Sequence, residues 1–297
     1  MEGEPKKEMY DLLPSSVYPK TFNVLPGEAM KSIENKFITY MMQFPVIVKP
    51  EVGGQGILLR KIDSQEQLLN YHKKNPFEYI VQQFVHYPME VSIFYYRYPD
   101  ETTGHITGFL HKIPLLVTGD GIHSLRELIQ LHPKATKYIT ELQKSHGKNF
   151  DTILPPGGEY KLSYAANHNR GASFIDLKND IDQKLISVID SISNYVNDFF
   201  YGRYDIMCSS VEDLKENKNF TILEYNGCGA EPNHFYDTGY TLLGAYKEIL
   251  MHWKVLYEIS LQNHKKGIPY WPLKKGTRFL KETRKYYAQM KEADKLI

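Results

Sequence analysis

Cysteine is scarce in this sequence: Cys208 and Cys228 are the only two in 297 residues. So few cysteines exclude a disulfide-stapled scaffold and are typical of a reducing, cytoplasmic setting. No apolar run approaches the length that a membrane-spanning helix needs. Residues 1–10 are polar and charged, which is unlike a secretory signal peptide. These absences predict a cytoplasmic protein without a membrane span.

A charge excess of one sign is also missing, because the formal net charge is +1. Nothing global therefore points to nucleic acid or to an acidic membrane surface as a partner. The charge is uneven, however: residues 264–297 hold 10 Lys or Arg and 3 Asp or Glu, a local net of +7. This basic C-terminal helical tail is either a solvated face or a contact for an anionic partner or substrate. The oligomeric state stays open.

Apolar residues make up 42% of the chain, and 23 tyrosines raise the aromatic share to 13%. A chain of this size and composition can bury a sizeable core. Helical and strand patterns alternate irregularly, which favours an α+β fold over a regular βαβ barrel. We expect four parts: an extended N-terminal segment (1–26), a small lobe (27–78), a large lobe carrying a metal site (79–262) and the basic tail (263–297).

Two short β-type runs carry the strongest chemical signal, Arg203–Cys208 and Phe220–Asn226. Side chains on a strand alternate between faces, so Asp205 would share a face with Arg203, and Glu224 with Asn226. If the runs pair as a hairpin, Asp205 and Glu224 meet on one polar face. Two close carboxylates repel unless a cation or a proton lies between them, and Asp, Glu and Asn are hard oxygen ligands that suit Mg²⁺. The alternative is the solvent face of an antiparallel sheet.

A second candidate site is the lysine–glycine segment that follows the apolar run Val46–Val48. Lys49 ends this predicted strand, and Gly53, Gly54 and Gly56 follow before a second strand predicted over 57–62. A lysine can offer a point charge to phosphate oxygens, and glycines let backbone N–H groups approach them. The order differs from a Walker loop, which leads into a helix. A hairpin loop with a lysine guarding an edge strand explains the pattern equally well.

With both segments in view, the chain resembles the ATP-grasp superfamily, specifically the D-alanine–D-alanine ligases and the cyanophycin-synthetase-like carboxylate–amine ligases. The similarity runs in order from Lys7 to about Asp237. The segment 44–50 resembles the family's nucleotide-lysine strand, and 202–207 with 223–226 resemble its magnesium motifs. The resemblance implies an ATP-grasp fold, with the nucleotide held between a small α+β lobe and a larger antiparallel-sheet lobe.

The resemblance also implies roles for single residues. ATP would be bound by two lysines, the glycine loop, the adenine hinge and a ribose-binding acid: Lys7 (with Lys6 as a competitor), Lys49, Gly53, Gly54, Gly56, Gln82, Gln83, Val85 and Glu90. Mg²⁺ would be held by Asp205, Glu224 and Asn226. Arg203 matches the arginine that stabilises developing negative charge. Arg170, in a segment similar to the cyanophycin-synthetase-like branch, is a second candidate catalytic arginine, although ordinary turn chemistry also explains that segment.

The sequence departs from these families at two places. Their N-terminal α/β domain precedes the first lysine, whereas only a few residues precede Lys7, so either the chain is truncated or that part of the substrate site is built differently. After Asn226, the Ser-bearing loop of the D-alanine ligases is replaced by Gly227-Cys228-Gly229-Ala230-Glu231. D-Alanine specificity is therefore not carried over.

The expected reaction is ATP- and Mg²⁺-dependent activation of a carboxylate as an acyl phosphate, followed by attack of an amine. Two alternatives remain: an ATP-grasp kinase that releases a phosphorylated product, and a non-catalytic nucleotide-binding module. The substrates are expected to be small-molecule or peptide carboxylates and amines. The 11 histidines lack the H-E-x-x-H zinc spacing. We expect His168 and His234 to be polar loop residues rather than acid–base catalysts.

Overall fold

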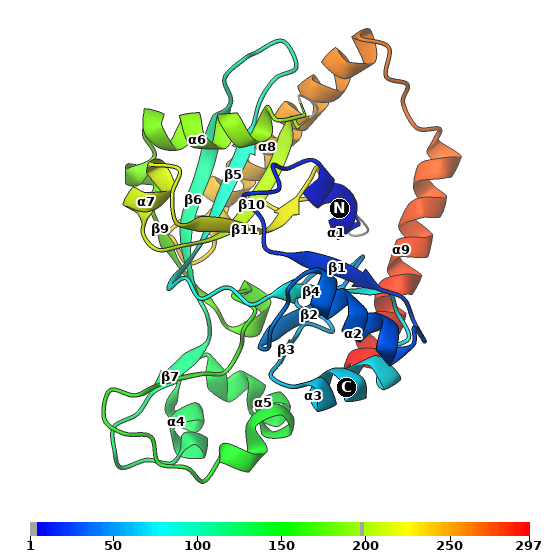
Figure 1. Ribbon diagram of the computed structural model, residues 1–297. Helices are drawn as coiled ribbons and strands as arrows, with labels where there is room; N and C mark the ends of the chain where they lie inside the picture. Colours follow the sequence, from blue (N-terminus) through cyan, green and yellow to red (C-terminus); the bar gives the residue numbers. More distant parts are fainter. Residues whose placement is uncertain (1–4, 197–198) are drawn as a thin grey trace. The chain divides into compact units, whose positions relative to one another are not determined.

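The structure, a computed structural model, describes residues 5–196 and 199–297 (Figure 1). The chain forms two compact units. The large unit comprises the residues up to His111 together with Asp176–Ile297, and the small unit is Lys112–Ile175. Helices are combined with largely antiparallel sheets, so the α+β class predicted from the sequence is confirmed.

The first sheet of the large unit has four strands in the order β1-β4-β2-β3. These are β1 (Thr21–Val24), β4 (Tyr79–Gln83), β2 (Val46–Pro50) and β3 (Arg60–Ile62). Helices α2 (Met30–Thr39) and α3 (Gln65–Lys74) close one face, where buried apolar side chains include Phe22, Ile33, Val48 and Leu68. Helix α3 begins at Gln65, where the Ser64 side chain accepts a hydrogen bond from the backbone N–H of Gln67.

The second sheet has the order β11-β10-β5-β6-β9. Its strands are β5 (Met89–Tyr96), β6 (His105–Ile113), β9 (Ser173–Asp176), β10 (Tyr201–Cys208) and β11 (Phe220–Asn226), and the short helix α7 (Val211–Lys215) lies between the last two. Helix α6 (Gln183–Ser193) covers one face, and its Leu185 and Ile189 pack in a core with Ile93 and Tyr204. Because strand side chains alternate, this packing leaves Arg203 and Asp205 on the opposite face.

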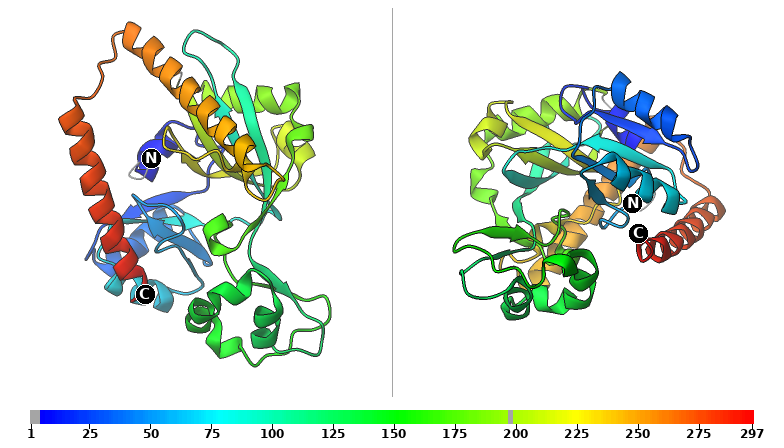
Figure 2. Two further views of the ribbon diagram at one scale, coloured as in Figure 1. Left: turned by 180° about the vertical axis from the view of Figure 1, so that it is seen from behind. Right: turned by 60° about the horizontal axis from the view of Figure 1, so that its bottom comes forward.

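Helix α8 (Leu242–Lys265) covers part of that opposite face, as the reverse view in Figure 2 shows. Its Val255 and Ile259 pack against Phe94 and Tyr201. Among the described helices, none is long and apolar enough to span a membrane.

Helix α9 (Leu273–Asp294) follows and packs its last turns on the segment before β3. There Tyr287 and Met290 join a small core with Ile57 and Leu58. The strand predicted from Ile57 was wrong at its start, because residues 55–58 form a turn and β3 begins only at Arg60.

The small unit has a compact core of its own. Strands β7 (Leu116–Thr118) and β8 (Glu159–Lys161) pair antiparallel, and helices α4 (Leu125–Leu131) and α5 (Ile139–His146) pack beside them. Leu115, Leu125, Ile129 and Phe150 are among the buried side chains. Helix α4 begins with a capping box, in which Ser124 and Glu127 each accept from the other's backbone N–H.

Three boundaries differ from the sequence prediction. Residues 6–11, predicted as extended, form helix α1 (Lys6–Asp11), whose Tyr10 is anchored in the main core. Strand β4 belongs to the first sheet, although it was placed with the large lobe at 79–262. The amphipathic pattern of residues 181–200 predicts one long helix, but α6 ends at Ser193. Residues 197 and 198 of that range lie outside the described residues, as do residues 1–4.

Candidate functional site

The polar face of the second sheet brings the predicted metal ligands together. Strands β10 and β11 pair antiparallel with Asp205 directly opposite Glu224 and Arg203 directly opposite Asn226. Directly paired residues point to the same side of a sheet, so all four side chains share one face. The hairpin pairing predicted from the sequence is therefore confirmed. We call Asp205, Glu224 and Asn226 the carboxylate face.

Asp205 is the centre of this face, and only 5% of its surface is exposed. Its Oδ2 accepts from Nδ2 of Asn226 at 3.3 Å and lies 3.4 Å from Nη2 of Arg203. Arg203 also donates from Nη1 to the carbonyl of Glu231, in the loop after β11, at 3.1 Å. The donor set is made of oxygen ligands of the type that Mg²⁺ prefers.

Lys49 reaches this face from the first sheet. Its ammonium group is buried and donates to the main-chain carbonyl of Leu223 at 2.9 Å, where the β10–β11 register shifts by a residue. The hydroxyl of Tyr10 donates to the same carbonyl at 2.6 Å. Burial lowers the pKa of Lys49, and the nearby Glu224 and Asp205 carboxylates oppose that shift. A buried ammonium beside carboxylates can neutralise part of the charge of a bound phosphate.

Of the two N-terminal lysines, Lys6 and not Lys7 points to this region. The Lys6 ammonium lies 3.5 Å from Oε1 of Glu224 and donates to the carbonyl of Gly53 at 3.1 Å. The Lys7 side chain is exposed, and its backbone N–H donates to the Glu51 carboxylate at 2.8 Å. The geometry therefore brings Lys6, and not Lys7, to the carboxylate face. Adjacent side chains of an α-helix point to different sides, so the neighbouring lysines of α1 cannot both reach this face.

The glycine loop is packed against helix α9. A Cβ atom added to Gly53 would lie 2.9 Å from Cε of Met290, and one added to Gly54 would lie 3.1 Å from the Tyr287 hydroxyl. The loop is further tied to α9 by the backbone N–H of Leu58, which donates to the Asp294 carboxylate at 2.8 Å. Close approach of a helix thus accounts for Gly53 and Gly54 as well as a phosphate would. Gly56 adopts a φ of 70°, which glycine tolerates best.

The predicted adenine hinge lies on and just after β4. The side chain of Gln82 is buried and donates to the hydroxyls of Tyr10 at 2.7 Å and Thr21 at 3.0 Å, so its amide nitrogen is already engaged within the protein. The backbone N–H of Gln83 is engaged by the carbonyl of Lys20. Val85 is half-buried. For these three residues, a contact with adenine stays a prediction.

Glu90, the predicted ribose-binding acid, lies on β5 directly opposite Met207. Two residues along the strand, Ser92 lies opposite Asp205. Glu90 therefore shares the polar face with Asp205, at one end of it. A contact of Glu90 with ribose stays a prediction.

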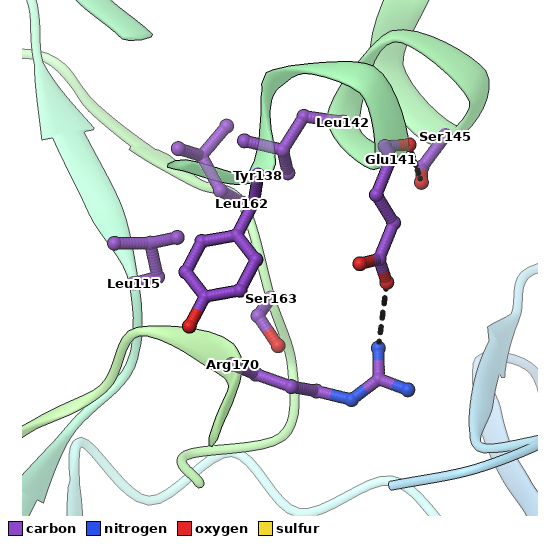
Figure 3. A pocket seen from close by; sticks show the side chains of 8 residues that line it. All are labelled: Leu115, Tyr138, Glu141, Leu142, Ser145, Leu162, Ser163 and Arg170. Atoms are coloured by element: carbon purple, nitrogen blue, oxygen red, sulfur yellow. Dashed lines mark hydrogen bonds and ion pairs between the residues drawn. The ribbon is translucent and has the colours of Figure 1, made fainter. Parts of the chain in front are cut away.

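Arg170 lies in the small unit, in a short pocket drawn in Figure 3. Its Nη1 is 3.3 Å from Oε1 of Glu141 on α5, and the two side chains point toward each other (Figure 3). The rest of the wall combines two serines, Ser145 and Ser163, with larger side chains, namely Leu115, Tyr138, Leu142 and Leu162. In the small unit Arg170 is thus a partner of Glu141, and its catalytic role stays a prediction.

The sequence prediction missed Tyr10, which links the two sheets. Its hydroxyl joins Gln82, Lys49 and the Leu223 carbonyl, and burial raises its pKa, so the hydroxyl stays protonated. Little in the sequence singles out Tyr10, since it lies in a short helix between prolines. Lys6 was named only as a competitor of Lys7.

Comparison with known proteins finds no matching family model. The sequence is 23% identical over 209 residues to the cyanophycin synthetase of Synechocystis sp., covering 62% of this chain but only 23% of that protein. The D-alanine–D-alanine ligase of Bacillus anthracis aligns with 88% of this chain and 67% of its own, at 12% identity and a TM-score of 0.46. The ATP-grasp ligase PsnB, solved with a minimal precursor, aligns with 86% of this chain and 60% of its own, at 10% identity and a TM-score of 0.44. The chain thus spans about a quarter of the length of its curated relative.

Proposed function

We propose that this protein uses ATP and Mg²⁺ to activate a carboxylate as an acyl phosphate and joins it to an amine. The observation that carries the proposal is the carboxylate face. Asp205 and Glu224 lie directly opposite each other, with the Lys6 ammonium 3.5 Å from Glu224 and the Lys49 ammonium 2.9 Å from the Leu223 carbonyl. Close carboxylates and two ammonium groups form a site for a metal-bound polyphosphate, in which charges of both signs are balanced.

The donor set fits Mg²⁺, because the carboxylate face supplies carboxylate and amide oxygens and no sulfur. When bound, Mg²⁺ would neutralise charge on the phosphates of ATP. Lys6 and Lys49 would bind phosphate oxygens of the same nucleotide. Both lysines are buried, so their charges are screened little by water and act strongly on a bound phosphate.

Arg203 would act on the reacting groups. An oxygen of the substrate carboxylate attacks the terminal phosphorus of ATP, the bond to ADP breaks, and ADP leaves. The amine then attacks the acyl carbon, phosphate leaves, and the amine loses a proton. Negative charge develops in both steps, and a guanidinium can contact it with two N–H groups. Arg203 is already held in place by Asp205 and the Glu231 carbonyl.

The test measures ADP release by the purified full chain with Mg²⁺, ATP and pools of carboxylates, with and without a pool of amines. We expect ADP release that depends on an added carboxylate. In Glu224→Gln it should fall by at least about a hundredfold, because the variant loses one anionic ligand of the metal. Glu212→Gln, a change of an exposed residue on α7, is the matched control and should keep full activity. ATP turnover that is independent of carboxylate, or undiminished in Glu224→Gln, would contradict the proposal.

A further inference from the structure

A cluster of three side chains outside the carboxylate face combines two histidines and a glutamate. Glu248 and His252 lie one turn apart on α8, and His234 comes from the loop after β11. Oε1 of Glu248 is 2.9 Å from Nε2 of His234 and 3.4 Å from Nε2 of His252. One ligand atom from each residue lies within 4.8 Å of the others. We call these residues the histidine cluster.

The histidine cluster is buried, with His234 4% and His252 1% exposed. Phe94 packs edge-on against the His252 ring, with the ring centroids 4.5 Å apart. Gly108 of β6 lies under His234, since a Cβ atom there would come within 2.3 Å of the ring Nδ1. A strand residue without a side chain therefore makes the space that the imidazole fills. The cluster is a preformed feature of the core rather than a surface contact.

Hydrogen bonds within the chain do not fully satisfy this cluster. Nδ1 of His234 is buried and has no hydrogen-bond partner among the described residues. A buried polar atom without a partner costs stability. Both Nε2 atoms also converge on one carboxylate oxygen. Two Nε2–H groups that donate to this oxygen would give these distances, and so would a cation held by the three side chains.

The spacing matches a metal site. In a tetrahedral zinc site with bonds of about 2.0–2.1 Å, neighbouring ligand atoms are about 3.3 Å apart. The distances of 2.9 and 3.4 Å from Glu248 to the two imidazoles bracket that value. Nδ1 of His252 lies 3.0 Å from the Tyr201 hydroxyl, which can accept from Nδ1–H. Nε2 of the same ring also lies 3.3 Å from Oγ1 of Thr107, a hydroxyl contact that a metal on Nε2 would replace. Two imidazoles and one carboxylate are ligands that suit zinc better than magnesium.

We propose that His234, Glu248 and His252 bind a divalent transition metal ion of the zinc class. The ion would join the loop after β11 to helix α8. This loop also supplies the Glu231 carbonyl to Arg203 and the Asn233 amide to Ser92, which lies opposite Asp205. The site would therefore fix the loop that borders the carboxylate face. It is separate from the proposed Mg²⁺ site and does not depend on the ligase reaction.

The test is zinc binding by the untagged full chain after chelator treatment and dialysis, measured by elemental analysis and by calorimetric titration with Zn²⁺. We expect one tightly bound zinc per chain in the wild type. Glu248→Gln and His252→Gln should each weaken binding by at least about a hundredfold, since each removes a direct ligand. Glu248→Gln can still form hydrogen bonds to both imidazoles, and circular dichroism checks its fold. Bound Co²⁺ should give the strong visible absorption of a tetrahedral site.

Two controls separate this site from other metal binding. His105→Gln changes an exposed histidine that contacts Glu101 at 3.1 Å, and it should keep the zinc. Glu224→Gln changes the carboxylate face and should keep it too. A wild type that takes up no zinc, or zinc affinity unchanged in both cluster variants, would overturn the proposal and leave the histidine cluster as a hydrogen-bonded core. Loss of the zinc in Glu224→Gln alone would place the ion on the carboxylate face instead and equally overturn it.

Discussion

The ammonium group of Lys49 donates a hydrogen bond of 2.9 Å to the main-chain carbonyl of Leu223, the residue that precedes Glu224. Lys49 lies on the first sheet and Leu223 on the second, so this bond connects the proposed phosphate lysine to the proposed metal strand. Tyr10 donates to the same carbonyl from α1. The three elements therefore meet at one peptide group, beside the carboxylate face.

Lys49→Met should weaken ATP binding by roughly ten- to a hundredfold, the effect of losing a charged hydrogen bond to phosphate. Binding of adenosine, which has no phosphate, should change little. The fold should survive, because Met fills a similar volume without a buried charge. The Tyr10 hydroxyl still donates a hydrogen bond to the Leu223 carbonyl. Calorimetric titration with both ligands measures the effect. Equal losses for ATP and adenosine would show that Lys49 acts on the fold.

Lys6→Ala and Lys7→Ala form a matched pair of neighbouring changes. Lys6→Ala should weaken ATP binding by about tenfold or more, since its buried ammonium faces Glu224 and the Gly53 carbonyl. Lys7→Ala should have little effect, because that side chain is exposed and the Lys7 contact with Glu51 uses the backbone N–H. The KM for ATP, measured for both variants, shows which of the two lysines binds ATP. A larger effect for Lys7 would restore the original sequence assignment.

Gly202→Ala should destabilise the protein. The added Cβ would lie 2.3 Å from the Tyr225 hydroxyl, which is held by a 2.5 Å hydrogen bond to the Tyr201 carbonyl. Overpacking of this kind costs roughly 1–3 kcal/mol of unfolding free energy. Gly276→Ala is the control, because the added Cβ meets no described atom within 4 Å apart from its own stretch of helix backbone, and on helix α9 it should gain about 1 kcal/mol. Denaturant unfolding of both variants gives the comparison. A stable Gly202→Ala would mean that the Tyr225 ring moves freely.

The paired strands β10 and β11 could be predicted from the sequence, because period-two alternation shows directly which residues share a face. Helix α1 could not, since six residues between prolines have little helical preference and are held by Tyr10 in the core. The histidine cluster was missed for a related reason. Glu248 and His252 are legible as an i,i+4 pair on α8, but His234 joins them only through the fold.

The glycine loop shows a different limit. Its three glycines predict a close approach of something to the backbone, and the sequence cannot say whether that is a phosphate or a helix. In the structure Tyr287 and Met290 of α9 make the approach at Gly54 and Gly53. The small unit, Lys112–Ile175, was likewise placed within a single large lobe because its ends carry no change of composition.

Hydroxylamine trapping tests the central claim most directly, since it converts an acyl phosphate into a stable hydroxamate. With ATP, Mg²⁺ and the carboxylate that supports ADP release, the wild type should accumulate hydroxamate. Arg203→Lys should lose about a hundred- to a thousandfold in rate, because lysine cannot reproduce the two-point contact of the guanidinium with the developing charge. ADP release with the carboxylate but without any hydroxamate would contradict carboxylate activation and indicate phosphoryl transfer to another acceptor group.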